Sequence, residues 1–340
     1  MIIEVARRFN TEVHLWYPVL ADRLDGQDPD EGSRVRSVGG YLGYGHHGLW
    51  EGFEESGESF LFHCPQDSEV IEHSITEVRS LLDIHGFSGV FLDRIRYPSP
   101  ANGIEMLLSC FCDRCGAVNH SSTQDALRFW GELCQSGEFL SWDDLIIKSG
   151  LEELFDSRTK HITDLVTSIG DGIDRSKYLI GLDLFSPALA SLVGQDYCRL
   201  AEICDWIKAM TYTKAVGPAG LPLEVSSLIS ALQTLNPQVT ADQASRWVEA
   251  LLGFDENSIP SFGRKVLQQE IQRAKTAVAN HSELVVGVEL VDHPQFPTTV
   301  SPQEAKELID GVRDSKQSLI ACWNLLYIPE ETQRILALNV

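Results

Sequence analysis

The sequence predicts a parallel α/β barrel of the (β/α)8 type, because short apolar runs alternate with amphipathic helical stretches along nearly the whole chain. About seven such units follow one another, and several of the apolar runs end in an acid. Strands that alternate with helical crossovers form a parallel sheet, and this number of units favours a barrel. An open doubly wound sheet is the alternative, disfavoured because no Gly-rich phosphate turn follows any strand.

The expected elements follow in a regular order. A helix end is expected at 2–9, and a first strand at 13–18 closes at Pro18. The strand 60–64 comes next, and the helix 68–85 ends at a glycine. Further strands are expected at 90–93, 178–185, 206–212, 284–290 and 318–324, and further helices within 121–170, at 196–203, 222–235, 240–252 and 262–279, and after Ser301.

Two loops interrupt this order. Residues 21–57 are rich in Gly, Asp, Glu and Ser, which predicts either an enzyme lid or a surface excursion. Residues 97–120 form a Cys-rich loop. We therefore expect one barrel domain over 1–340. An eight-stranded barrel needs one more strand before the first helix, so either that strand is lost or the barrel has seven strands.

The composition, 43% hydrophobic and 22% charged, is that of a globular protein. Lys and Arg number 27 and Asp and Glu number 49, so the net charge is 27 − 49 = −22. A surface this acidic repels phosphate backbones, and nucleic acid is not an expected partner. No apolar run reaches the roughly 18 residues of a membrane helix, and no signal-peptide pattern is present. We therefore expect a cytoplasmic protein without a membrane partner.

The chain has eight cysteines, which in a reducing compartment stay thiols or bind metal. Cys110, Cys112 and Cys115 lie in one loop at metal-ligand spacing, one ligand short of the structural zinc shell. Cys64 is expected to supply the fourth, since it ends the strand before 90–93 and consecutive barrel strands have neighbouring loops. The set predicts a structural zinc that folds a long loop over the barrel mouth. An iron–sulfur cluster and unrelated thiols are the alternatives.

Three expected strands end in acids: Asp93, Asp183 and Glu289. Because side chains alternate along a strand, these acids point into the barrel mouth, where Gly181 and Gly287 on the same faces leave room. Catalytic groups of such barrels come from the C-terminal strand ends. Paired carboxylates suit sugar chemistry, in which one acid protonates the leaving oxygen and the other attacks or stabilises the anomeric carbon. For any one acid, a solvated loop position is the alternative.

Other side chains near strand ends are candidates for holding a substrate. Arg94 and Arg96 follow Asp93 and either orient it or pair with loop acids. Aromatic rings at strand ends serve as sugar platforms about as often as they fill a core. The remaining candidates are Trp16, Lys208, Tyr212, Trp323 and Asn324.

The order of Cys64, a strand-end acid and the Cys-x-Cys-x-x-Cys motif at 110–115 resembles the zinc site of the family 42 glycoside hydrolases, beta-galactosidases with a TIM barrel. The stretch Gly-Val-Phe-Leu-Asp-Arg-Ile-Arg-Tyr-Pro at 89–98 is similar to a large group of glycoside-hydrolase-like barrels. The resemblance covers most of the chain in layout, and in specific motif it covers 64–115 and, more weakly, Glu289.

In the clan that includes family 42, the acid/base is a Glu after Asn at the end of the fourth strand, and the nucleophile is a Glu ending the seventh. If a first strand is missing here, the resemblance implies that Asp93 ends the fourth strand and Glu289 the seventh. Asp93 departs from the pattern, since it is Asp and follows Leu92. In other barrel glycosidases an Asp at the fourth strand is the nucleophile, so the two roles are open to exchange, and Asp183 could join them.

These observations predict a glycoside hydrolase with a retaining mechanism, a carbohydrate substrate, Glu289 as nucleophile and Asp93 as general acid/base. A non-catalytic carbohydrate-binding barrel and a metal-dependent hydrolase are the rival hypotheses. The sugar, the linkage and the oligomeric state stay open, a homo-oligomer included.

Overall fold

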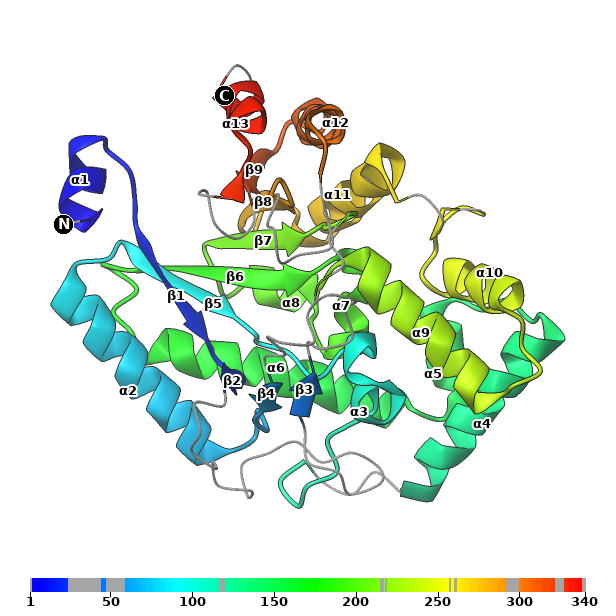
Figure 1. Cartoon of the computed structure of the whole chain (residues 1–340). Coiled ribbons are helices and arrows are strands. Elements are labelled where there is room, and N and C mark those ends of the chain that lie inside the picture. Colours follow the sequence, from blue (N-terminus) through cyan, green and yellow to red (C-terminus); the bar gives the residue numbers. More distant parts are fainter. Residues whose placement is uncertain are drawn as a thin grey trace.

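The structure, a computed structural model, is a mixed α/β fold built on a parallel sheet (Figure 1). It describes residues 2–23, 44–46, 59–115, 120–214, 217, 219–256, 258–259, 262–291, 300–321 and 327–337. Six strands form the sheet in the order β1-β5-β6-β7-β8-β9, and every neighbouring pair is parallel. Their bounds are β1 His14–Pro18, β5 Gly89–Asp93, β6 Leu179–Phe185, β7 Trp206–Met210, β8 Glu283–Val288 and β9 Ser318–Ala321.

The helices follow the expected alternation with the strands. Helices α2 and α6 contact each other along the β1–β5 side, and α11, α12 and α13 lie in succession along β8 and β9 (Figure 1). The bounds are α1 Ile2–Arg8, α2 Ser68–His85, α3 Ile104–Leu107, α4 His120–Ser136, α5 Trp142–Ser149, α6 Glu152–Asp171, α7 Pro187–Ala190, α8 Tyr197–Ala201, α9 Leu221–Leu235, α10 Ala241–Leu251, α11 Arg264–Val278, α12 Pro302–Asp314 and α13 Glu330–Ala337, with short 3₁₀ turns η2 Pro100–Asn102 and η3 Ser191–Val193.

Local chemistry explains where the predicted helices begin and end. Helix α2 begins after Asp67, whose side chain accepts from the Glu69 N–H, and it ends at Gly86 in the left-handed conformation with φ 70°. Helix α12 begins after Ser301 as expected, with a capping box in which the Ser301 side chain accepts from the Glu304 N–H. These predictions are confirmed because caps depend on residues only a few positions apart.

The strand expected at 60–64 is present but lies elsewhere. Strand β4, Ser59–Phe62, pairs antiparallel with β2, Ala21–Arg23, and with β3, Tyr44–His46, in a separate three-stranded sheet. The expectation that this strand belongs to the barrel is therefore wrong. Two short strands of the small sheet come from the segment expected to be a loop at 21–57. A backbone bond from the His63 N–H to the Leu20 carbonyl continues the antiparallel pairing beyond β4.

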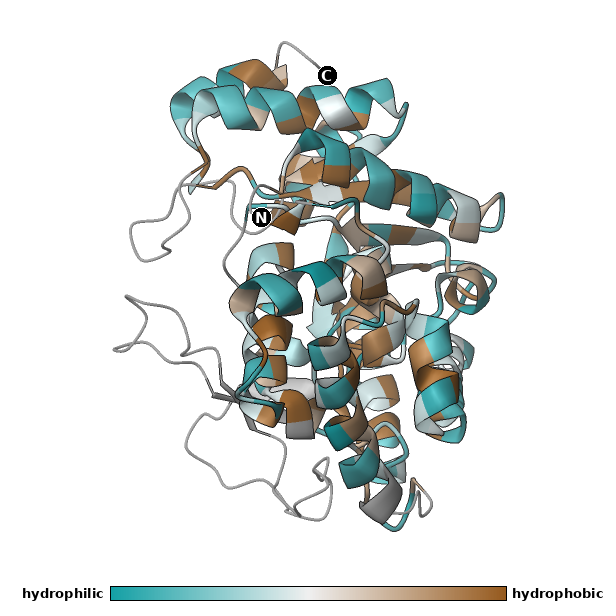
Figure 2. Cartoon of the chain, turned by 90° about the vertical axis from the view of Figure 1, so that its right-hand side faces the viewer, coloured by the Kyte–Doolittle hydropathy of each residue, from teal (hydrophilic) through white to brown (hydrophobic). Residues whose placement is uncertain are grey.

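The hydrophobic core lies between the sheet and its helices, with a second apolar cluster among the helices α4, α5, α9 and α10. The outward side chains of the strands are fully buried under the helices, as Leu92, Leu182 and Val288 illustrate with 0% exposure. The helices carry hydrophilic and hydrophobic residues in alternation (Figure 2), which is the pattern of amphipathic helices that cover a sheet. Among the described residues, none of the helices combines the length and the hydropathy that crossing a membrane requires.

Candidate active site and metal centre

A row of charged side chains crosses the inner face of the sheet, which is the face opposite to the one that carries Leu92, Leu182 and Val288. Strand register pairs Asp183 of β6 with Lys208 of β7, and it pairs Leu92 with Leu182, so that Asp93 lies beside Asp183 at the next step. Neighbouring strands are about 4.8 Å apart, which brings the two carboxyl groups close together. The charge of Asp93 acts on Asp183 and disfavours a second negative charge there.

Asp183 and Lys208 form a buried ion pair. The Lys208 Nζ lies 2.9 Å from Asp183 Oδ2, and the two side chains are 7% and 6% exposed. Burial raises the pKa of Asp183 from 3.8 to about 7, the attraction of Lys208 opposes the rise, and Asp93 adds to it. Asp183 Oδ1 has no hydrogen-bond partner among the described residues. Near neutral pH this carboxyl can therefore exchange a proton.

Aromatic rings line the inner face one level below this row. Phe91 and Trp206 stack with ring centroids 4.8 Å apart, and the His14 ring meets Trp206 edge-on at 5.4 Å. Gly181 makes room for the indole, since a Cβ at this position would lie 2.1 Å from a Trp206 ring carbon. The Lys208 Nζ lies 5.4 Å above the Phe91 ring centroid, a cation–π distance. The charged side chains therefore pack against the aromatic rings of Phe91 and Trp206.

Asp93 is the member of the row nearest to solvent, and both of its oxygens accept hydrogen bonds. The Trp16 indole N–H donates to Oδ2 at 3.0 Å, and the Arg94 backbone N–H donates to Oδ1 at 2.6 Å. Arg94 adopts φ 55°, a left-handed conformation that residues other than glycine rarely take. Trp16 is 52% exposed, which makes it an accessible aromatic surface directly beside a carboxylate.

Glu289 lies just beyond the end of β8 and is 1% exposed. The Lys214 backbone N–H donates to its Oε1. Register pairs Met210, the last residue of β7, with Gly287, so the loop after β7 lies beside the end of β8. A Cβ at Gly287 would lie 2.8 Å from Lys208 Cε and 3.2 Å from the Tyr212 ring, which shows how closely these side chains gather.

Arg96 is part of the core. Its guanidinium lies over the rings of Phe62 at 5.0 Å and Phe185 at 4.7 Å, and it donates to the Tyr97 carbonyl. Burial lowers the pKa of Arg96 to about 10, while the negative charges of Glu224 and Asp93 favour its protonated form. It connects the small sheet to the end of β6. Trp323 and Asn324 lie outside the described residues.

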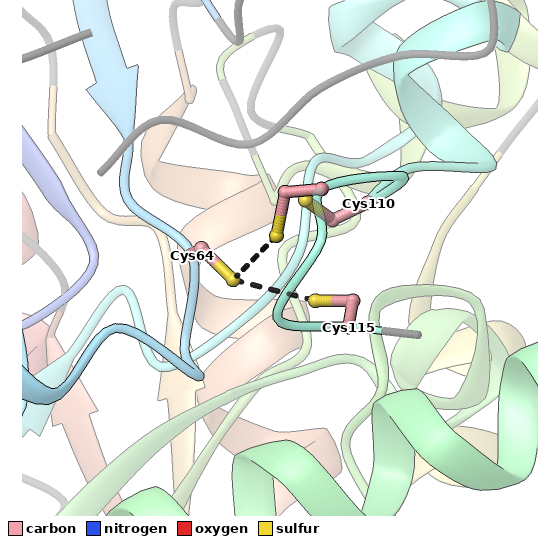
Figure 3. A group of neighbouring side chains, drawn as sticks. Cys64, Cys110 and Cys115 are labelled. Atoms are coloured by element: carbon pink, nitrogen blue, oxygen red, sulfur yellow. Dashed lines mark hydrogen bonds between the residues drawn. The ribbon is translucent and has the colours of Figure 1, made fainter. Parts of the chain in front are cut away.

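The four predicted cysteines converge. Their sulfur atoms all lie within 4.8 Å of one another, and Cys64 Sγ lies 3.3 Å from Cys115 Sγ and 3.5 Å from Cys112 Sγ. Figure 3 shows Cys64, which follows β4, facing Cys110 and Cys115 from the loop after α3. The expectation that Cys64 meets the other three is confirmed, but by another route: the small antiparallel sheet, not a barrel strand, brings it there.

The donor set fits a single tetrahedral ion. Zinc–sulfur bonds of about 2.3 Å in a tetrahedron put the sulfurs about 3.8 Å apart, close to the spacings of this set. An iron–sulfur cluster would hold the thiolates farther apart, since several iron and sulfide ions would lie between them. Hydrogen bonds with Cys110 lower the pKa of Cys112 and raise that of Cys64, as in thiols that share protons. The four thiolates could hold a divalent ion with no open position.

Sequence reasoning missed three contributors to these sites. Trp206 begins its strand two residues before Lys208, so the period of two could have put it on the inner face. Glu224 is fully buried, and its carboxylate accepts from the Ser99 hydroxyl and the Ala101 and Ala219 N–H groups, which ties the loops after β5 and β7 together. The third is Arg158 of α6, which is buried and donates to the Leu107 carbonyl just before the cysteine loop. No local pattern marks Glu224 or Arg158, because their partners are distant in the sequence.

No protein-family model matches the chain, and no match appears among curated proteins. Solved structures similar to it include glycoside hydrolases. The catalytic domain of beta-amylase from Paenibacillus polymyxa matches with a TM-score of 0.51 at 9% identity, over 100% of this chain and 84% of that one. The PgaB (BpsB) glycoside hydrolase domain from Bordetella bronchiseptica has a TM-score of 0.49 at 11% identity, over 99% and 77% of the two chains. The beta-amylase likeness is one of fold, and it agrees with a barrel-like α/β architecture.

Proposed function

We propose that this protein is a glycoside hydrolase whose reacting groups are strand-end carboxylates. The observation that carries the proposal is Asp93, which is hydrogen-bonded to the indole of the exposed Trp16 and lies beside the buried Asp183–Lys208 pair. A sugar ring stacked on the indole would present its glycosidic bond to that carboxylate. Carboxylates next to aromatic surfaces suit a reaction that passes through an oxocarbenium-like transition state.

The proposed roles follow from position at the strand ends and from charge. Asp93 and Glu289 are the reacting pair, one as the general acid/base and the other as the nucleophile. Asp183 and Lys208 form the buried ion pair beside Asp93 and set the charge around it. Tyr212 and Trp16 contact the sugar. Arg94 and Arg96 support the loop that presents Asp93, the first through its backbone and the second from the core.

The four cysteines are proposed to hold a structural zinc ion. A complete tetrahedral shell leaves no position for a substrate or a reacting water. This favours a structural role and disfavours the metal-dependent hydrolase. The ion would join the end of the small sheet to the loop after β5, the same loop that begins at Asp93. Four ligands from two segments 46 residues apart would restrain that loop, since 110 − 64 = 46.

The test is hydrolysis of a panel of aryl glycosides by the wild type and by Asp93→Ala, Glu289→Ala and Asp183→Asn. We expect the first two variants to lose about 10²- to 10⁴-fold in kcat/KM, the range for removal of an acid/base group or more. Asp143→Asn is the control, because Asp143 is exposed on α5. Restoration of activity by azide would identify the nucleophile by the anomeric configuration of the glycosyl azide formed.

The outcomes separate the hypotheses. Full activity of either alanine variant overturns the assignment of that carboxylate. If the wild type binds oligosaccharides but cleaves none across the panel, the non-catalytic carbohydrate-binding protein is correct. If chelation abolishes turnover while the fold remains intact, the metal is catalytic and the structural zinc is wrong.

A further inference from the structure

Arg158 of α6 is a buried cation. It is 1% exposed, and its Nη1 donates to the Leu107 carbonyl at 2.7 Å. The guanidinium lies 4.4 Å above the Tyr97 ring and 5.1 Å above the Phe155 ring. This arginine therefore lies between two aromatic rings and has no contact with bulk water. Such a charge needs a compensating negative charge nearby, because an isolated buried ion costs several kcal/mol.

No carboxylate supplies that compensation in the part of the chain that the structure describes. Arg158 forms no ion pair there, and its Nε and Nη2 are buried without a hydrogen-bond partner. Burial lowers the pKa of Arg158 to about 10, and the groups that oppose this effect are Tyr97, Cys110 and Cys115. Burial raises the pKa of Tyr97, so its phenol stays neutral, and the cysteine set is the remaining source of negative charge near this arginine.

The geometry connects the arginine to the sulfur atoms through Tyr97. The ring of Tyr97 lies under the guanidinium, and its hydroxyl lies 4.0 Å from Cys115 Sγ and 2.9 Å from Nδ1 of His161. His161 is one turn along α6 from Arg158, so both side chains contact Tyr97 from the same face of this helix. Four thiolates with one divalent ion carry −4 + 2 = −2, a buried dianion. One guanidinium charge at this place reduces it to −1.

We propose that Arg158 is the counter-charge of the four-cysteine site, so that metal binding and the packing of α6 depend on each other. This inference rests on the metal part of the proposed function. The arginine favours the metal-loaded form because the loaded site is anionic. Without the ion the site lacks this anionic complex, so the arginine stabilises the metal-free form less than it stabilises the metal-loaded form. Arg158 is thus a positioning residue for the metal and touches neither substrate nor reacting atoms.

The test compares Arg158→Met, which keeps the length and apolar volume, with Arg158→Lys, which keeps the charge. Zinc content is measured by elemental analysis, and affinity is measured by competition with a chelating dye. Cobalt(II), whose thiolate complex absorbs in the visible range, gives a second measure of affinity. We expect Arg158→Met to bind both ions about 10- to 100-fold more weakly and Arg158→Lys to stay much closer to wild type.

The decisive readout is the difference between the stability changes with and without metal. Arg158→Met should lower the urea midpoint of the zinc-loaded protein more than that of the chelated protein. A purely structural arginine would lower both equally. The matched control is Arg273→Met, since Arg273 also lies over an aromatic ring, that of Phe254, but is paired with Glu270. Its zinc affinity should remain that of the wild type.

Two results overturn the inference and are distinguishable. If the wild type binds one zinc per chain and Arg158→Met binds it equally tightly, Arg158 is not the counter-charge and the metal site stands. If the wild type binds no stoichiometric metal under reducing conditions, the metal proposal and this inference fail together, while the carboxylate proposal is unaffected.

Discussion

The substitution Gly181→Ala tests the arrangement of the inner face, on which the candidate active site depends. An added methyl carbon would lie 2.1, 2.2 and 2.7 Å from three ring carbons of Trp206. Carbon atoms pack at about 3.5–4.0 Å, so the indole would have to move by about 1.5 Å. That movement is blocked because Trp206 stacks on Phe91 and meets His14 edge-on.

Overpacking of this kind costs about 1–3 kcal/mol. Urea unfolding followed by tryptophan fluorescence measures this cost. The control is Gly170→Ala in helix α6, where the new methyl group would lie 3.3 Å from the flexible end of Ile180. This control should be neutral or stabilising, by up to about 1 kcal/mol, because alanine favours a helix more than glycine does.

The substitution also reports on the site itself. A displaced Trp206 ring would push on Phe91, which is the register neighbour of Trp16. Trp16 in turn donates the hydrogen bond to Asp93. We expect kcat/KM for any cleaved glycoside to fall with stability. An unfolding free energy within about 0.5 kcal/mol of the wild type would mean that Gly181 does not face the indole, and the inner-face arrangement would be refuted.

Three further predictions concern the two sites. Cys112→Ser should abolish stoichiometric zinc and lower the thermal midpoint, whereas Cys134→Ser, a buried thiol outside the set, should retain the metal; equal zinc content in both would contradict the site. Burial raises the pKa of Asp183 from 3.8 to about 7, so the folded state binds a proton more tightly and the stability from this group is lost as pH rises through about 7. Asp183→Asn should therefore gain stability relative to the wild type between pH 4 and 7, measured as the difference in urea midpoints, and a constant difference would show that the carboxyl titrates normally. Glu224→Gln should cost about 1–3 kcal/mol in thermal unfolding, because its amide cannot accept all three bonds that the carboxylate accepts; an unchanged midpoint would mean that this buried acid does not join the loops.

Much of the fold follows from local sequence signals. The alternation of strands and helices, the bounds of α2 and the caps at Asp67 and Ser301 depend on residues within one or two turns of each other. The inward direction of Gly181 and Asp183 follows from the strand period of two. These signals are strong because near neighbours in the chain are near neighbours in space whatever the rest of the molecule does.

Other features required the tertiary structure. A short apolar run such as 59–62 is compatible with a strand of a parallel barrel and with a strand of an antiparallel sheet. Only its pairing with β2 and β3 shows that it belongs to the antiparallel sheet. The pairing of Lys208 with Asp183 depends on register between two strands, and a one-residue slip would separate them.

By itself, the sequence determined which residues could act: the strand-end acids, the four cysteines and the aromatic candidate Trp16. The tertiary structure decided which of them meet. It joined Cys64 to the Cys110–Cys115 loop through a sheet that the sequence did not reveal, and it set Arg158 beside that loop with no acid partner among the described residues. Residue type and periodicity are local properties of the chain, whereas charge compensation and metal geometry depend on distances between segments far apart in sequence.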